Sequence, residues 1–149
     1  MAAGDLIRIG TLWQRNCAAA LDALESSSVG SVWNTWSPTY GGGGSQTFGT
    51  VTTHYAKYIQ IGKRVHFSIS ATGTTGGSTD PNVSFTLPVT AASSDALNFS
   101  AWYVDGGNPL PGSARGATTT KIYVAKLDYA NWGAGSNRRI SCSGCYEAA

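Results

Sequence analysis

The sequence predicts a mainly β protein, with an antiparallel β-sandwich or jelly-roll-like domain preceded by a short N-terminal arm and one α-helix. Short segments of alternating apolar and polar residues follow one another from residue 51 to the C-terminus, as in strands that bury one face. Clusters of Gly, Pro, Asn and Asp separate these segments and are typical of turns. Helix-like spacing of apolar residues does not occur after residue 30, so a parallel sheet, which needs long crossover connections, is excluded.

Charged side chains are scarce in this sequence. They make up 12% of its 149 residues, against about 25% in ordinary soluble proteins. Glycine, serine and threonine are abundant, so hydroxyl and backbone groups must cover much of the surface, as in β-rich extracellular or virion proteins. A chain of this length can bury one proper core. We therefore expect an arm and helix over residues 1–32 and a β domain over residues 33–149.

The N-terminal region is predicted to be an extended arm over residues 1–10 and a helix over residues 11–26, in which Thr11 and Gln14 form the capping box. A helix of this length is marginal alone in water, so its apolar stripe needs a partner surface. That partner is either the β domain, or a copy of the helix or another protein. The residues that we expect to serve attachment or oligomerisation are Leu6, Ile9, Leu12, Trp13, Leu21 and Leu24.

Residues 33–71 are predicted to form the first corner and the central hairpin of the β domain. Trp33, Trp36 and Tyr40 precede the glycine run 41–44, which indicates a tight corner or a flexible link. Alternation predicts strands over 55–61 and 64–70, joined by a turn at Gly62-Lys63. On the second strand we expect Val65, Phe67 and Ile69 to point inward and His66, Ser68 and Ser70 to point outward.

The remaining sequence continues the pattern at short intervals. Residues 72–82 are rich in glycine and hydroxyls and are expected to form a loop. Strands are predicted over residues 83–87, 97–103 and 121–127, and a last one begins at residue 139. The total is about six to eight strands, separated by turn clusters.

Three of these segments carry a resemblance to a known class of proteins. They are Trp36-Ser37-Pro38-Thr39, the hairpin from Tyr58 to Phe67, and Phe85-Thr86-Leu87-Pro88. Together, over residues 33–89, they resemble the small β-rich modules of tail-fibre, receptor-binding and capsid-decorating proteins of tailed bacteriophages. The resemblance implies a non-enzymatic virion component, commonly trimeric and displayed on the particle surface, with the N-terminal arm and helix as its attachment segment.

The charged and polar residues do not suggest an enzyme. Four carboxylates, Asp80, Asp95, Asp105 and Asp128, each lie beside a turn or strand end, where aspartate caps the backbone. None of them forms an evident acid–base pair of the glycosidase kind. His54 and His66 have no nucleophile in a recognisable elbow. We therefore expect no catalytic residues.

The cysteines do not indicate a disulfide framework. Their number is odd, and Cys142 and Cys145 form a CxxC without a second spaced ligand pair for zinc. On a regular strand, residues three apart point to opposite faces. We expect buried or terminal free thiols, with a local disulfide as the alternative if Gly144 makes a turn, and we expect no metal and no cofactor.

Two aromatic loops are the candidate recognition surfaces. Trp and Tyr beside Asn and Asp are typical of protein interfaces and of sugar sites. Subunit packing is the favoured role, a place in the core is the second, and sugar binding is the third. The candidate ligand or subunit contacts are Trp102, Tyr103, Asp105, Asn108, Tyr129, Asn131 and Trp132.

The expected function is that of a phage virion structural protein, either a capsid decoration or a head-fibre type component. The alternative is a tail-associated adhesin that recognises a host glycan or surface protein. The expected partners are the chain itself, as a homotrimer, and other capsid or tail proteins. The basic residues are scattered, so we expect no nucleic acid partner.

No membrane insertion is expected either, because the chain lacks the roughly 20 consecutive apolar residues of a spanning helix. Asp5, Arg8 and Arg15 interrupt the region that a signal peptide would need. The expected location is the virion, after synthesis in the host cytoplasm.

Overall fold

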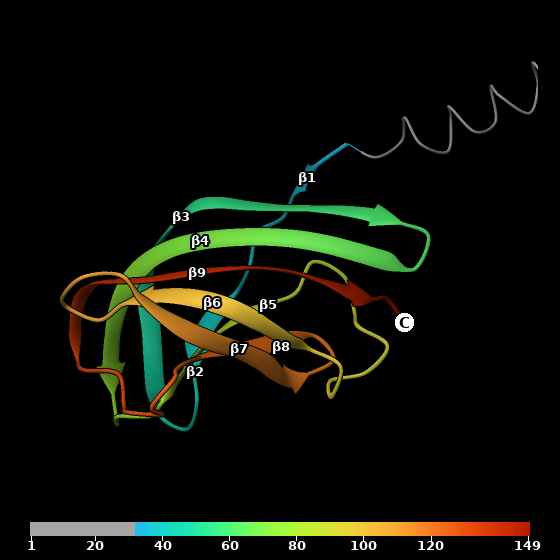
Figure 1. Ribbon diagram of the computed structural model, residues 1–149. Helices are drawn as coiled ribbons and strands as arrows, with labels where there is room; N and C mark the ends of the chain where they lie inside the picture. The colour runs from blue at the N-terminus through green and yellow to red at the C-terminus, as the bar shows by residue number, and fades with distance from the viewer. Residues whose placement is uncertain (1–31) are drawn as a thin grey trace, which may run out of the picture. The chain divides into compact units, whose positions relative to one another are not determined.

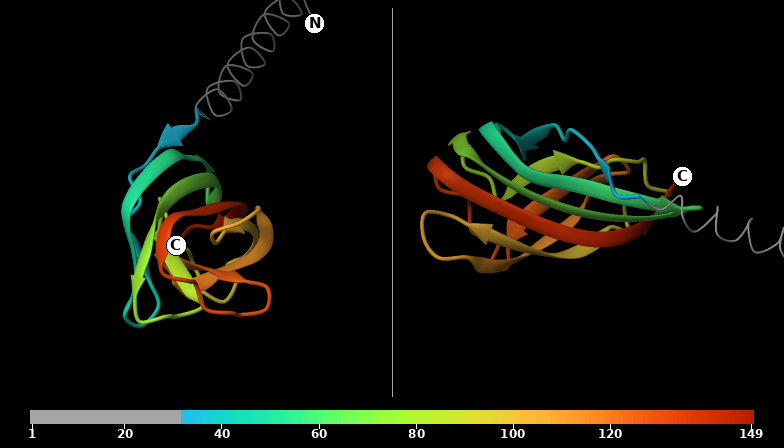
Figure 2. Two further views of the ribbon diagram at one scale, coloured as in Figure 1. Left: turned by 90° about the vertical axis from the view of Figure 1, so that its left-hand side faces the viewer. Right: turned by 90° about the horizontal axis from the view of Figure 1, so that it is seen from above.

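The computed structural model describes residues 32–149 of the chain. They form one nine-stranded antiparallel sheet, curled into a half-barrel (Figures 1 and 2). In sequence order the strands are β1 (Asn34–Thr35), β2 (Tyr40–Gly42), β3 (Gln46–Ile61), β4 (Arg64–Gly77), β5 (Asn82–Thr86), β6 (Asn98–Val104), β7 (Leu110–Thr118), β8 (Lys121–Lys126) and β9 (Gly135–Glu147). Their order in the sheet is β1-β3-β4-β9-β6-β7-β8-β5-β2.

The central hairpin is confirmed and is longer than predicted. Gly62 makes the turn with a φ of 58°, a conformation that favours glycine. The predicted loop over residues 72–82 is wrong for its first half, because β4 continues to Gly77. Gly73 leaves room for the ring of Phe48, which a Cβ atom would meet at 2.9 Å. Gly73 therefore allows close packing within a strand. The threonines around it are β-branched, and β-branched residues are favoured in strands.

The core lies on the concave face of the curled sheet. Val65, Phe67 and Ile69 point inward and are buried, as predicted. The Phe67 ring is central, with ring centroids 5.1 Å from Phe99 and 5.9 Å from Tyr146. The prediction that alternation gives two packed sheets is not confirmed, since the hydrogen-bonded ladder is continuous from β3 through β4, β9 and β6 to β5. One sheet instead curls back on itself, as the left view in Figure 2 shows, and the buried side chains lie on its inner face.

The bend is concentrated in β3 and β4. The register of this pair shifts twice, between Gly49 and Thr52 and again between Thr53 and Tyr55. An extra residue in one strand of an antiparallel pair bends that strand and increases its twist. These irregularities allow the two longest strands to wrap around the core rather than cross it, as their curvature in Figure 1 shows.

Residues 34–42, which we call the closing segment, connect β3 at one end of the curled sheet to β5 at the other. Trp36 donates a backbone hydrogen bond to Ala56 O of β3 (3.2 Å), and its indole Nε1 donates to Thr86 O at the end of β5 (3.2 Å). Thr39 O accepts a hydrogen bond from Thr86 N (3.0 Å). The segment starts as β1 beside β3 and ends as β2 beside β5.

The remaining predicted strands are confirmed, whereas one strand was missed and the N-terminal segment lies outside the described residues. The strands at residues 83–87, 97–103 and 121–127 are confirmed as β5, β6 and β8, and the last strand is confirmed as β9. Strand β7 was not predicted, because Pro111 and two glycines hide its alternation. The predicted arm and helix, with Leu6, Ile9, Leu12, Trp13, Leu21 and Leu24, lie outside the described residues. Within residues 32–149, no helix is long and apolar enough to span a bilayer.

The closing segment gives a first testable prediction. Replacing Trp36 by Phe keeps an aromatic ring but removes the indole donor to Thr86 O, so we expect the free energy of unfolding to fall by about 1 kcal/mol. Trp33→Phe is the matched control, because Trp33 is half exposed, and a surface change of this kind alters stability by less than about 0.5 kcal/mol. Urea denaturation followed by circular dichroism measures both. Equal effects of the two variants would contradict the closing role.

Candidate functional site

The predicted aromatic contacts divide into exposed and buried residues. Trp102 is 56% exposed and Tyr129 is 52% exposed, so both can meet a ligand or a neighbouring subunit. Trp132 is fully buried, with its indole Nε1 donating to Pro81 O at 3.0 Å, and Tyr103 is 7% exposed. Their rings pack edge to face with centroids 5.4 Å apart. Tyr103 and Trp132 are therefore core residues, which corrects their assignment as candidate contacts.

Asp105 lies just after β6 and is occupied by internal contacts. Its carboxylate lies 2.5 Å from Lys126 Nζ and 2.9 Å from Arg138 Nε, and it accepts a hydrogen bond from Gly133 N (3.2 Å). Lys126 Nζ also donates to Asn131 O (2.7 Å). These contacts tie the loop before β9 to the end of β6. Asp105 thus has a structural role, although it was predicted as a contact residue.

The environment of Asp105 sets its pKa. Burial raises the pKa of this carboxyl, but the hydrogen bonds from Lys126 and Gly133 and the positive charges of Lys126 and Arg138 outweigh burial and lower it below the usual value. The carboxylate is therefore ionised at neutral pH.

The two predicted asparagine contacts, Asn108 and Asn131, are exposed in the turns on either side of this cluster.

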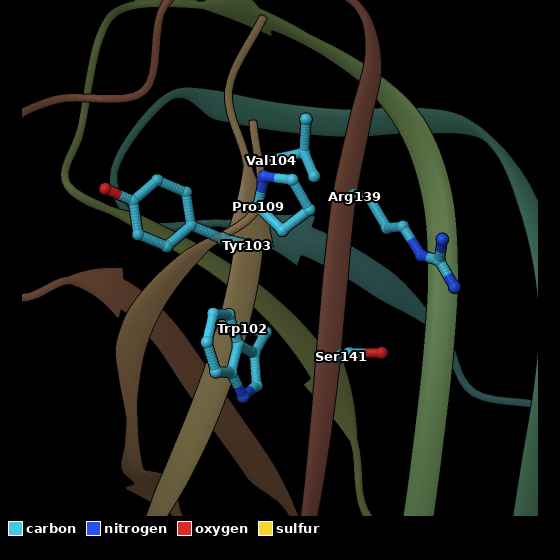
Figure 3. A pocket seen from close by; sticks show the side chains of 6 residues that line it. All are labelled: Trp102, Tyr103, Val104, Pro109, Arg139 and Ser141. Atoms are coloured by element: carbon cyan, nitrogen blue, oxygen red, sulfur yellow. The ribbon is translucent and has the colours of Figure 1, made fainter. Parts of the chain in front are cut away.

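Trp102 lies at a shallow pocket on the outer, convex face of the sheet (Figure 3). The pocket has a volume of about 220 Å³ and is lined by Trp102, Tyr103, Val104, Pro109, Arg139 and Ser141. In Figure 3 the phenol ring of Tyr103 points away from the side on which Arg139 and Ser141 lie. Two strands, β6 and β9, supply most of the lining.

The same face carries a line of side chains across four strands. The strand register places Tyr55 of β3 opposite Ser70 of β4, Ser70 opposite Ser141 of β9, and Ser141 opposite Trp102 of β6. We call these four residues the aromatic–serine row. Three strand spacings separate its two aromatic ends, a distance of about 14 Å. A second pocket, of about 260 Å³, joins the two ends and is lined by Tyr55, Ser68, Ser100, Trp102, Ser141, Cys142 and Ser143.

Arg139 lies beside this row and is held in place by it. Its Nε and Nη2 atoms both donate to Ser70 Oγ at 3.2 Å. Ser70 was predicted to point outward, but it is fully buried, and the guanidinium of Arg139 is hydrogen-bonded to its hydroxyl. Arg139 itself is exposed, and no carboxylate of the described residues forms an ion pair with it.

Sequence reasoning found Trp102 but missed its neighbours on this face. Tyr55, Arg139 and Ser141 were not proposed as site residues. A local signal existed in the alternation of polar residues at 139, 141 and 143 and at 68 and 70. The pairing of β4 with β9 brings these stretches together, and no local pattern predicts that pairing.

Cys142 and Cys145 are free thiols, as expected, and they point to opposite faces, whereas Cys17 lies outside the described residues. Cys142 is buried, and burial raises the pKa of its thiol to about 12, so that it stays protonated. Cys145 is exposed, with its Sγ atom 3.8 Å from His66 Nε2. In residues 32–149, no group of three or more His, Cys, Asp or Glu side chains could hold a metal ion.

The predicted turn aspartates serve the backbone in two cases. Asp80 Oδ1 accepts a hydrogen bond from Asn82 N at 2.8 Å, and Asp128 Oδ1 accepts one from Ala130 N at 3.0 Å. Both are side-chain turns of the kind that aspartate commonly makes. These contacts match the capping role that was expected of them.

Comparison with known proteins identifies no relative. No protein-family model, no curated protein and no solved structure matches the chain. The geometry of the domain and the residues of its outer face are therefore the basis for assigning a function.

The two tryptophans that were predicted together should differ sharply in their effect on stability. We expect Trp132→Ala to lower the free energy of unfolding by about 3–5 kcal/mol, because it removes a fully buried ring. Trp102→Ala removes an exposed ring and should change it by less than about 1 kcal/mol. Chemical denaturation monitored by circular dichroism measures both values. Similar losses for the two variants would contradict the assignment of Trp132 to the core and Trp102 to the surface.

The Asp105 cluster should make stability depend on pH. A carboxyl whose pKa is lowered by folding stabilises the folded state above the unfolded-state pKa of about 4, and this contribution disappears as the pH falls through the folded-state pKa. We therefore expect Asp105→Asn to be less stable than the wild type at pH 7, and the difference to shrink at acid pH. Unfolding measured between neutral and acid pH checks this. A difference that is constant over this range would show that Asp105 acts through packing alone.

Proposed function

We propose that this protein is a non-enzymatic structural component of a tailed-phage virion, displayed on the particle as a capsid decoration or head-fibre type protein. In this proposal residues 1–32 attach the chain to the particle and to its copies in a homotrimer. The β domain is the displayed part. The observation that carries the proposal is that the β domain is self-contained: its curled sheet encloses the core, and the closing segment connects the two ends of the sheet.

The sheet edges support display at high density. The two outermost strands, β1 and β2, are only two and three residues long. Long exposed edge strands can pair with other chains, and short, covered edges reduce this risk. A component present in many copies on one particle benefits from such protection. The scarcity of charge and the abundance of hydroxyl groups also fit a surface that faces the medium.

The second candidate function is that of a tail-associated adhesin that recognises a host glycan or surface protein. One observation favours it: Tyr55 and Trp102 are both exposed and lie at the two ends of the aromatic–serine row. Exposed aromatic rings of this kind contribute strongly to binding. In the structural role alone, the same rings would pack against a neighbouring subunit of the trimer.

Deletion of residues 1–28 tests the attachment role. We expect the shortened chain to keep its β-type circular dichroism spectrum and its cooperative unfolding, because the described domain begins after the deleted residues. It should sediment as a monomer and should fail to co-purify with virions of the phage that carries the gene. The point variant Leu21→Asp/Leu24→Asp is the matched control, because it disrupts the predicted apolar stripe without shortening the chain. A shortened chain that still joins particles would refute the proposed attachment.

A further inference from the structure

We propose that the convex face of β3, β4, β9 and β6 binds an acidic oligosaccharide, with Tyr55 and Trp102 stacking on sugar rings and Arg139 binding a sugar carboxylate. This inference rests on the adhesin alternative and names its ligand class and its site. The ligand is defined by its chemistry: a chain of hydroxyl-rich rings that carries a carboxylate, as in uronic or sialic acids.

The two aromatic rings give the site its length. Tyr55 is 43% exposed and Trp102 is 56% exposed, although both lie within the hydrogen-bonded ladder of the sheet. They are separated by two strands, or about 14 Å, which suits a short oligosaccharide laid across the strands. The apolar C–H faces of sugar rings pack on aromatic faces, and strand positions hold such rings with little loss of conformational freedom. The pocket of about 260 Å³ between the rings is open to solvent along this line.

The floor between the rings is made of hydroxyl groups. Ser68, Ser141 and Ser143 of β4 and β9, together with Ser100 of β6, line it. Each serine hydroxyl can donate one hydrogen bond and accept two, and sugar hydroxyls have the same capacity. The core of a stable subunit interface is more apolar than this. The polarity of the floor therefore favours a sugar over a second copy of the chain.

Arg139 supplies the charge selectivity. Two of its N–H groups are directed to Ser70 Oγ, which fixes the plane of the guanidinium beside the row. It is exposed, and none of the carboxylates in residues 32–149 neutralises it. Lys57, which is exposed on β3 and opposite Ser68 in the register, adds a second positive charge. A planar, oriented guanidinium matches the geometry of a carboxylate.

The experiment uses the full chain and defined probes. Trigalacturonate and sialyllactose provide a carboxylate on two kinds of sugar, and methyl-esterified trigalacturonate and lactose are their neutral counterparts. Isothermal titration calorimetry measures binding. We expect the wild type to bind at least one acidic probe more tightly than its neutral counterpart, and the preferred acid distinguishes a uronic from a sialic ligand.

The variants assign the roles within the site. Arg139→Gln should weaken binding of the acidic probe about tenfold, because a charge-assisted hydrogen bond is lost, and should leave the neutral probe unchanged. Trp102→Ala should weaken both probes. Trp33→Ala and Lys121→Gln are the matched controls, since they remove an exposed aromatic ring and an exposed cation outside the row, and they should bind as the wild type does. Tyr129→Ala tests the competing site in the loops.

Three results would overturn the proposal. The first is that the wild-type chain binds no acidic probe at about 1 mM. The second is that Tyr129→Ala, and not Trp102→Ala, abolishes binding, which would move the site to the loops. The third is that Trp102→Ala lowers the sedimentation coefficient, which would make the face a contact between copies. Incorporation of Arg139→Gln into virions is measured separately, so that a failure of sugar binding is distinguished from a failure of particle attachment.

Discussion

The architecture depends on the way in which the closing segment joins the two ends of one sheet. A curled sheet buries its concave face only if its first and last long strands are held near each other, and here β3 and β5 have no ladder between them. Trp36 contacts both, through its backbone to Ala56 and through its indole to Thr86. Tyr40 adds a hydrogen bond of 2.8 Å to Thr53 of β3 from the other end of the segment. The core around Phe67 is thus enclosed by covalent continuity and a few hydrogen bonds, and the two cysteines within residues 32–149 are free thiols.

Local structure was largely predictable from this sequence, whereas the assembly of the strands was not. Alternation identified the β3–β4 hairpin, because Val65, Phe67 and Ile69 bury one face and Gly62 makes a turn. The same alternation is compatible with two packed sheets or with one curled sheet. The choice between them depends on the bulges in β3 and on the pairing of β4 with β9, which joins residues about seventy positions apart. Gly73 shows a related ambiguity, since a glycine that makes room for Phe48 resembles a loop glycine in sequence.

The candidate site illustrates the same limit at the level of side chains. Trp102 could be proposed from its turn-flanked, aromatic setting, but Tyr103 and Trp132 have the same setting and lie in the core. Period-two geometry puts Trp102 and Tyr103 on opposite faces, and only the fold decides which face is buried. The partners of Trp102 come from three other strands, so a pattern within any single strand could not identify them. Asp105 was predicted as a contact residue because it lies in a turn. Its ion pairs with Lys126 and Arg138 instead give it a structural role.

The two thiols of β9 have a practical consequence for measurements on this protein. Cys145 points to solvent on the convex face, beside His66, while Cys142 points into the core with a strongly raised pKa. A thiolate is the species that reacts with alkylating reagents, so within this strand of the folded domain Cys145 is accessible to the reagent and Cys142 is protected. A dye or spin label at Cys145 would therefore report on the convex face without disturbing the packing beneath it. Reaction of Cys142 would report that the half-barrel has opened.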